Sequence, residues 1–352
     1  MASKQKRKHL KDDLVGMWKR AKPGGASDTE IEAQVEAQLQ KIQELKVKWY
    51  QSEGLGDIEP ADDGLWEGDI ILSLKQAEAA IAELENEMAG ARKKRGAAVF
   101  FEPLLTDRWN NAMWPQPIRW NVNGSFNSQE QQAMADALKE LETAVGCIKF
   151  EKVSEKSSTS YTVLLVEVLT AYCGGRSAIG MAYDNWQPLE MSRSSCTTME
   201  RWKSTFTHEV IHALGTWHEH VREDRDKFVK IFPENILKQY LHNYQIQTAS
   251  TSYGVAYNVK SIMHYETQSP IKPDVLTIDG QVIPRALNIQ PSDILQLKRT
   301  LCSPATCVDK YRDCGYNATV LGSCSDDLNG EQFSQDCKKS CGGCDSLFKT
   351  GI

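Results

Sequence analysis

Apolar residues recur with a helical period in one stretch near the N-terminus. Ser27, with Glu30 three residues later, has the pattern of a capping box and predicts the start of a helix. The residues that follow have the spacing of one apolar helix face, namely Ile31, Val35, Leu39, Ile42 and Leu45. A second helix is predicted over residues 75–88, which are rich in Ala, Glu and Leu. Residues 1–26 are basic and lack an apolar run, so we expect a flexible basic arm there.

After Arg95 the pattern changes to a mixture of helix and strand. The predicted elements are a helix over residues 128–145, strands within 147–153 and 161–168, and a helix over 202–214. We expect an irregular stretch from there to Cys302. A small cysteine-rich unit follows at residues 307–344. The chain therefore reads as an α+β domain between a largely helical N-terminal segment and a small C-terminal module.

Length and composition exclude several classes of protein. The 352 residues suggest about two to three domains, and charged residues at 25% with hydrophobic residues at 41% are ordinary for globular proteins. The net charge of −6 argues against a nucleic-acid partner held by a broad basic face. No apolar run approaches the roughly 18 residues of a membrane span, so we expect no such span.

The ten cysteines indicate an oxidising compartment. None precedes Cys147, and an even number clustered late in the chain is typical of a secreted protein with disulfides. The sequons at Asn123 and Asn317 fit a secreted glycoprotein. Residues 1–22 contain eight Lys or Arg and no apolar core of a signal peptide. We interpret this as an incomplete N-terminus, with unconventional export as the alternative.

One segment carries the chemistry of a metal site. His208 and His212 are four residues apart, so in a helix both rings face the same side and can bind one ion. Gly215 can end the helix in a sharp turn that brings His218 round as a third ligand. Three protein ligands leave a fourth position for water, which is typical of catalytic zinc. Glu209 lies beside the first ligand, where it can act as a general base.

The segment has the metzincin pattern H-E-x-x-H-x-x-G-x-x-H. Residues 218–226 resemble the extended signature of the astacin family, and Ser261-Ile262-Met263-His264-Tyr265 is similar to that family's Met-turn. The resemblance implies a two-lobed zinc protease domain over residues 96–302, with a twisted sheet and an active-site helix. It implies that Met263 forms the floor beneath the zinc. Tyr265 would ligate zinc at rest and stabilise the oxyanion when substrate binds. The disulfides implied are Cys147–Cys302 and Cys173–Cys196.

The resemblance extends to residues 1–95, which would be a pro-segment. Residues 65–70 resemble the family's inhibitory motif F-x-G-D, with Trp66 in place of Phe, and imply that the Asp69 carboxylate occupies the water position on zinc. A thiol cannot do this, because no cysteine precedes Cys147. The basic run that ends at Arg95 resembles a furin-type cleavage site, although a solvated helix end would have the same composition.

The tail has six cysteines in 38 residues, at 307–344, joined by a linker at 303–306 and followed by residues 345–352. Such a unit needs three disulfides as staples, and a zinc knuckle is the rival interpretation. The spacing resembles the ShKT domain, and that resemblance implies the pairs Cys307–Cys344, Cys314–Cys337 and Cys324–Cys341. The interval 325–336 lacks the Lys-Tyr pair on which channel block depends. We therefore expect a module that binds a protein or matrix partner.

These observations favour a secreted zinc endopeptidase made as a zymogen and activated by another protease near Arg95. Its substrates would be proteins or peptides. The alternative is a catalytically silent zinc-containing protein that binds partners, or a toxin, acting through the ShKT module. Astacins often favour acidic residues just after the cut, which needs a basic group in that pocket. Lys272 and Arg285 are the candidates, because both follow the Met-turn.

Overall fold

The computed structural model describes residues 3–21, 25–89, 114–123, 126–154, 162–169, 172–183, 186–247 and 252–302. Several sequence predictions lie outside these residues. They are the cleavage after Arg95, Gly124 and Ser125 of the first sequon, the sequon at Asn317, the linker 303–306, the ShKT unit 307–344 with its three cysteine pairs, and the tail 345–352.

Three helices form the N-terminal region: α1 (Ser3–Ala21), α2 (Asp28–Ser52) and α3 (Leu74–Met88). The capping box predicted at the start of α2 is confirmed, because Ser27 accepts from the Glu30 amide at 3.3 Å and Glu30 accepts from the Ser27 amide at 2.7 Å. The expectation of a flexible arm is wrong for residues 3–21, which form α1. Leu10, Leu14 and Met17 recur at helical spacing among the charges, and all three are buried.

Six strands of the described chain form one sheet, in the order β1-β5-β6-β4-β2-β3. Their bounds are β1 (Ile70–Ile71), β2 (Ile118–Val122), β3 (Phe150–Lys152), β4 (Val163–Val168), β5 (Gly175–Ala178) and β6 (Trp186–Met191). Neighbours are parallel except β5 and β6, which are antiparallel. The short strand β1 comes from the N-terminal region and pairs with β5, so this region completes one edge of the sheet.

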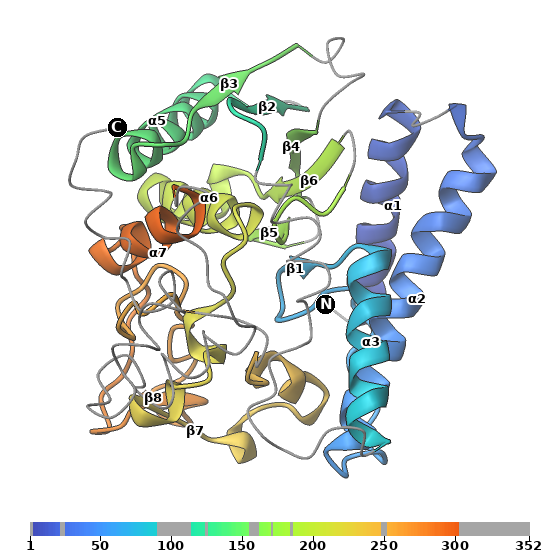
Figure 1. Cartoon of the computed structure of the whole chain (residues 1–352), viewed down its shortest axis with the longest axis vertical. Coiled ribbons are helices and arrows are strands. Elements are labelled where there is room, and N and C mark those ends of the chain that lie inside the picture. The colour runs from blue at the N-terminus through green and yellow to red at the C-terminus, as the bar shows by residue number, and fades with distance from the viewer. Residues whose placement is uncertain are drawn as a thin grey trace, which may run out of the picture.

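Helices cover both faces of the sheet (Figure 1). The helices α5 (Ser128–Val145), α6 (Met199–Ala213) and α7 (Pro291–Leu301) enclose the main core with Leu164 and Val166 of β4. Leu165 points to the other face, as the two-residue period of a strand requires, and packs with α1, α2 and α3. The chain is therefore a mixed α/β domain with a helical region against one side.

The segment from α6 to Cys302 is more regular than the sequence predicted. It contains α7 and the paired strands β7 (Val229–Ile231) and β8 (Val275–Thr277). Short 3-10 helices precede and follow α6, namely η3 (Ser194–Cys196), η4 (Glu219–Val221), η5 (Arg225–Lys227), η6 (Pro233–Asn235) and η7 (Lys238–Tyr244). The expectation of an irregular stretch is thus wrong for residues 291–301. A capping box of Gln290 and Asp293, with Pro291 at the first turn, starts α7.

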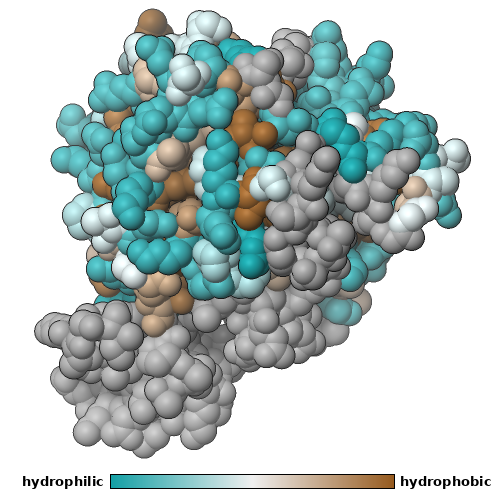
Figure 2. Space-filling view, turned by 90° about the horizontal axis from the view of Figure 1, so that it is seen from above, coloured by the Kyte–Doolittle hydropathy of each residue, from teal (hydrophilic) through white to brown (hydrophobic). Residues whose placement is uncertain are grey.

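Disulfides join distant parts of this domain. Cys147, just after α5, is bonded to Cys302 at the end of α7. Cys173, before β5, is bonded to Cys196 in η3. No helix of the described residues has the length and apolar character to cross a membrane. Figure 2 shows one face of the molecule as mainly hydrophilic, with hydrophobic residues in small separate patches.

Candidate metal centre

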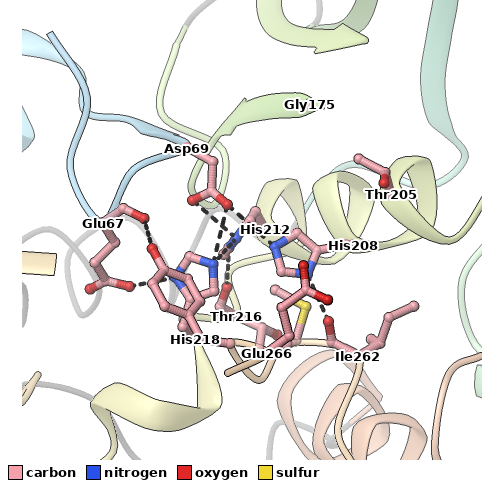
Figure 3. A network of polar contacts seen from close by, with 12 residues as sticks. Glu67, Asp69, Gly175, Thr205, His208, His212, Thr216, His218, Ile262 and Glu266 are labelled. Atoms are coloured by element: carbon pink, nitrogen blue, oxygen red, sulfur yellow. Dashed lines mark hydrogen bonds and ion pairs between the residues drawn. The ribbon is translucent and has the colours of Figure 1, made fainter. Parts of the chain in front are cut away.

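The helix α6 holds two of the predicted ligands in place. Thr198 caps its N-terminus by accepting from the Arg201 amide, and Trp202, Phe206 and Val210 are buried one turn apart in the main core. This buried face fixes the rotation of the helix, so His208 and His212 both project toward the N-terminal region (Figure 3).

The helix α6 ends at Ala213, and the turn that the sequence predicted follows it at Gly215. Its φ of 102° lies in the left-handed region, its amide donates to the His212 carbonyl at 2.8 Å, and the Thr216 amide donates to the Ile211 carbonyl at 3.2 Å. This pair of bonds is a Schellman motif, which closes the helix and reverses the chain. His218 thereby returns to the side of the helix that carries His208 and His212.

Four side chains converge on one point: His208, His212, His218 and Asp69. One ligand atom from each lies within 4.8 Å of all the others. The Asp69 carboxylate is 3.6 Å from His208 Nε2, 3.8 Å from His212 Nε2 and 3.3 Å from His218 Nε2. Tetrahedral ligands about 2 Å from an ion are separated by about 3.3 Å, so the four atoms fit one zinc ion.

Hydrogen bonds fix the orientation of each imidazole. Nδ1 of His208 lies 2.8 Å from the Ile262 carbonyl, and Nδ1 of His212 lies 2.7 Å from the Thr216 carbonyl. A carbonyl accepts only, so Nδ1 carries the proton and Nε2 presents a lone pair to the centre. Nε2 of His212 and of His218 lie 3.3 Å apart, which a cation between them explains.

The third histidine is held by a residue that the sequence did not single out. Glu67 is fully buried, and its carboxylate lies 2.7 Å from His218 Nδ1 while it accepts a bond of 2.7 Å from Gln247 Nε2. The signal in the sequence was an acidic residue two positions before Asp69. Nothing in the sequence indicated which histidine it contacts, because that depends on how two distant segments pack.

Asp69 lies on a tight turn at residues 66–70, which we call the blocking turn. Trp66 and Ile70 exchange backbone hydrogen bonds of 2.8 and 2.9 Å across it. Gly68 has a φ of 85°, and a Cβ there would lie 3.2 Å from the Tyr265 hydroxyl, so both the backbone conformation and the limited space favour glycine. The Tyr265 hydroxyl donates to the Glu67 carbonyl, so the turn also holds this tyrosine.

Glu209 is buried beside the centre. Its Oε2 atom has no hydrogen-bond partner among the described residues, and the same is true of Asp69 Oδ1. Both are polar atoms whose burial is costly unless a water or an ion joins them. The β5 backbone approaches Glu209 so closely that a Cβ on Gly175 would lie 2.6 Å from its carboxylate (Figure 3 labels Gly175).

We expect Gly175→Ala to displace Glu209 and lower kcat/KM for peptide cleavage by about a hundredfold, the size of loss that a misplacement of about 1 Å can cause. The three atoms nearest to such a Cβ all belong to Glu209 and none to a histidine, so zinc content should be unchanged. Parallel measurement of peptide cleavage and bound zinc on the released catalytic region checks this. Wild-type cleavage by the variant would show that the close approach has no part in positioning Glu209.

The remaining predicted residues take these positions. Met263 is buried in the main core, and its carbonyl accepts from the Glu219 amide at 2.8 Å. Asp293, another residue that the sequence did not indicate, accepts from Ser261 Oγ at 2.6 Å and from the Ile262 amide at 3.1 Å. The cap of α7 thus anchors the segment that carries Met263 and Tyr265.

Burial and neighbouring charges shift the pKa values of these side chains in opposite directions. Burial and the nearby Asp69 carboxylate raise the pKa of Glu209 well above its usual range. Burial alone would lower the pKa of His218, but the Asp69 and Glu67 carboxylates outweigh it and raise this pKa to about 10. Burial lowers the pKa of His212. The carboxylates therefore favour a positive charge among the rings, which a bound metal ion can supply.

Comparison with known proteins agrees with the geometry. Residues 106–289 match the model of the astacin family of peptidases. Zinc metalloproteinase nas-9 of Caenorhabditis elegans is 29% identical over 307 residues, which cover 82% of this chain and 54% of that protein. Zinc metalloproteinase nas-10 of the same organism is 27% identical over 306 residues, with 82% and 55% covered. The chain thus spans about half the length of these relatives.

Among solved structures, high choriolytic enzyme 1 of Oryzias latipes, a hatching enzyme zinc-protease, is 24% identical with a TM-score of 0.44, over 51% of this chain and 86% of that chain. The assignment rests on the sequence match, which covers more than half of the residues and includes the three histidines. The chain belongs to the astacin family, and its histidine triad is the zinc site typical of that family.

Proposed function

We propose that this chain is a zinc-dependent endopeptidase made in a blocked form. The observation that carries the proposal is the convergence of three imidazole Nε2 atoms and one carboxylate around a single point, with the buried Glu209 beside it. Three neutral nitrogens are the protein ligands of a catalytic zinc site, and the fourth position belongs to the reaction. Here Asp69 occupies that position.

Each residue has a distinct role in hydrolysis. Zinc bound at such a site supplies Lewis acidity, which makes water a nucleophile at neutral pH. Glu209 accepts the proton of the attacking water and donates it to the leaving amine. The Tyr265 hydroxyl donates a hydrogen bond to the oxyanion of the tetrahedral intermediate once it leaves the Glu67 carbonyl.

The blocked form combines three contacts of the N-terminal region. Asp69 takes the fourth ligand position, the Glu67 carbonyl holds Tyr265, and β1 occupies the edge of β5. An exposed strand edge is where an extended peptide can pair with an enzyme. Removal of the blocking turn therefore frees a ligand position, an oxyanion donor and a peptide-binding edge together. We propose that processing begins with a cut after Arg95, made by another protease.

Arg285 is the better candidate for recognition of an acidic side chain after the cut. Its guanidinium donates to Thr205 Oγ1 at 2.8 Å, and Thr205 precedes the ligand His208 by one helical turn (Figure 3). Lys272 is exposed, and its backbone amide donates to Ser269 Oγ in a local turn. We therefore propose protein substrates with Asp or Glu at this position.

The alternative functions receive less support. A silent zinc-containing protein does not need a general base, yet Glu209 is present, buried and held close to the centre. Action through the cysteine-rich unit 307–344 rests on residues outside the described part of the chain. We propose that this unit is an ShKT module that positions the enzyme on a protein or matrix partner. The two disulfides of the described residues support secretion.

A reconstitution assay tests the proposal. We expect the catalytic region, freed of residues 1–95, to bind one zinc per chain and to cleave peptides with Asp after the cut faster than matched peptides with Lys. A chelator should abolish cleavage, and added zinc should restore it. The three histidine ligands remain in the freed catalytic region, and only Asp69 is lost from the four converging ligands. Cleavage that survives complete removal of zinc would contradict the proposal.

A further inference from the structure

The N-terminal helices share a hydrophobic core with the catalytic domain. We call residues 3–88 the helical region. Its buried residues on α1, α2 and α3 form one cluster with Leu165 of β4, Trp186 of β6 and Ile179 just after β5. These three side chains lie on the sheet face opposite α5 and α6, and Figure 1 shows α1, α2 and α3 along that side. The region therefore covers apolar surface of the sheet in addition to its contacts at the metal centre.

Buried charges tie the same two surfaces together. Arg176 of β5 is fully buried between Glu190 of β6, at 2.5 Å, and Asp13 of α1, at 2.7 Å. On β4, the largely buried Glu167 forms an ion pair with the half-exposed Arg20 of α1. Separating the two surfaces would leave a buried charge without its counterpart, which is energetically costly.

A third set of contacts joins the helical region to the part of the domain that follows the metal ligands. The Tyr50 hydroxyl donates to the Lys238 carbonyl at 2.6 Å, and the Ala61 amide donates to the Gln239 carbonyl at 3.0 Å. Gln38 Nε2 donates to the Tyr183 hydroxyl at 2.8 Å. The contacts therefore involve segments that precede and follow the active-site helix in the chain.

The blocking turn is anchored on both of its sides within this assembly. Leu65, just before the turn, and Trp66, its first residue, are buried in the shared cluster. After it, β1 pairs with β5, and Gln38 Nε2 donates to the Leu72 carbonyl at 2.9 Å. The proposed cut after Arg95 lies beyond the end of α3 at Met88. None of the contacts named above depends on the chain between Met88 and Arg95.

We propose that the helical region remains bound as a separate subunit after the chain is cut near Arg95, with Asp69 still at the metal. Activation then requires a second event that removes the helical region from the sheet. The consequence of this inference for enzyme activity rests on the proposed function. The retention itself follows from the shared core, the buried ion pairs and the anchored turn.

The test uses the zinc-loaded full chain with the basic run 92–95 replaced by the recognition sequence of a site-specific protease. After cutting, we expect both fragments to elute together in size-exclusion chromatography. The cut complex should bind a peptide hydroxamate, a zinc-directed probe, no better than the uncut chain. Digestion of the helical region by a second protease should then restore probe binding. Separation of the fragments on cutting, or immediate probe binding by the cut complex, would overturn the proposal.

A matched pair of variants tests the contacts. Asp13→Ala removes the α1 partner of Arg176, whereas Asp12→Ala removes an exposed carboxylate on the same helix. We expect the first variant to raise the dissociation rate of the cut helical region by about tenfold, as loss of a partner to a buried charge acts mainly on dissociation. The second should leave the rate unchanged. Equal rates in the two variants would count against the retained subunit.

The readouts separate this inference from the proposed function. Co-elution and probe binding do not require catalysis. If the freed catalytic region binds zinc and probe but cleaves no peptide, the proposed endopeptidase fails while the retained subunit stands. If cutting alone releases the helical region and cleavage begins at once, the retained subunit fails while the endopeptidase stands.

Discussion

Glu209→Gln is expected to lower peptide cleavage by the freed catalytic region by about a thousandfold or more, within or above the range for loss of a general base. Glutamine has nearly the same shape, so the close approach of Gly175 should be preserved. An amide cannot accept the proton of the attacking water, so the chemical step is lost. Zinc content should stay at one per chain, because the carboxylate is not among the four converging ligands.

The control for this variant is Glu200→Gln, which makes the same chemical change at an exposed position in the first turn of α6. It should retain wild-type cleavage. Measurements of kcat/KM, zinc content and thermal unfolding on both variants distinguish loss of chemistry from loss of fold. Retention of wild-type cleavage by Glu209→Gln would exclude Glu209 as the base.

Asp69→Ala should give activity to the uncut chain. Asp69 is the only carboxylate among the four converging ligands. Burial would raise the pKa of Asp69. The charge of His218 and the hydrogen bonds of Asp69 to the histidines outweigh burial and hold this pKa well below its usual range. Loss of the Asp69 carboxylate opens the fourth ligand position beside the three histidines to water. We therefore expect cleavage of short peptides to rise by at least about a hundredfold over the wild-type uncut chain.

The matched control is Asp57→Ala, at an exposed position in the same loop, which should leave the uncut chain silent. Long protein substrates should gain less than short peptides from Asp69→Ala, because β1 still occupies the edge of β5. An uncut Asp69→Ala chain that binds zinc and stays as silent as the wild type toward short peptides would show that Asp69 does not block the site.

Local sequence patterns were enough to predict the helices whose signals were strong. The helices α2, α3, α5 and α6 lie where the sequence predicted helices, and the capping box of Ser27 is confirmed. The helix α1 was missed because its basic residues outnumber its three buried apolar ones. The helix α7 is only 11 residues long, and its signal was the cap formed by Gln290, Pro291 and Asp293.

The residues of the metal site also fall into two groups, those that local sequence patterns reveal and those that they do not. His208, His212 and Gly215 act through helix geometry and a helix end, so their spacing in the sequence was sufficient. Glu67, Gly175 and Asp293 act across segments that lie far apart in the chain. Their roles depend on tertiary packing, which periodicity and motif spacing do not encode. A buried carboxylate beside a histidine ligand can be found only once both segments are placed in space.

The measurement that tests the account most directly is anomalous X-ray diffraction at the zinc absorption edge, on crystals of the zinc-loaded uncut chain. We predict one strong peak between Nε2 of the three histidines and an oxygen of Asp69, about 2 Å from each. A zinc ion with a water in the fourth position and Asp69 turned away would contradict the blocked form. A peak away from His208, His212 and His218 would contradict the metal centre itself.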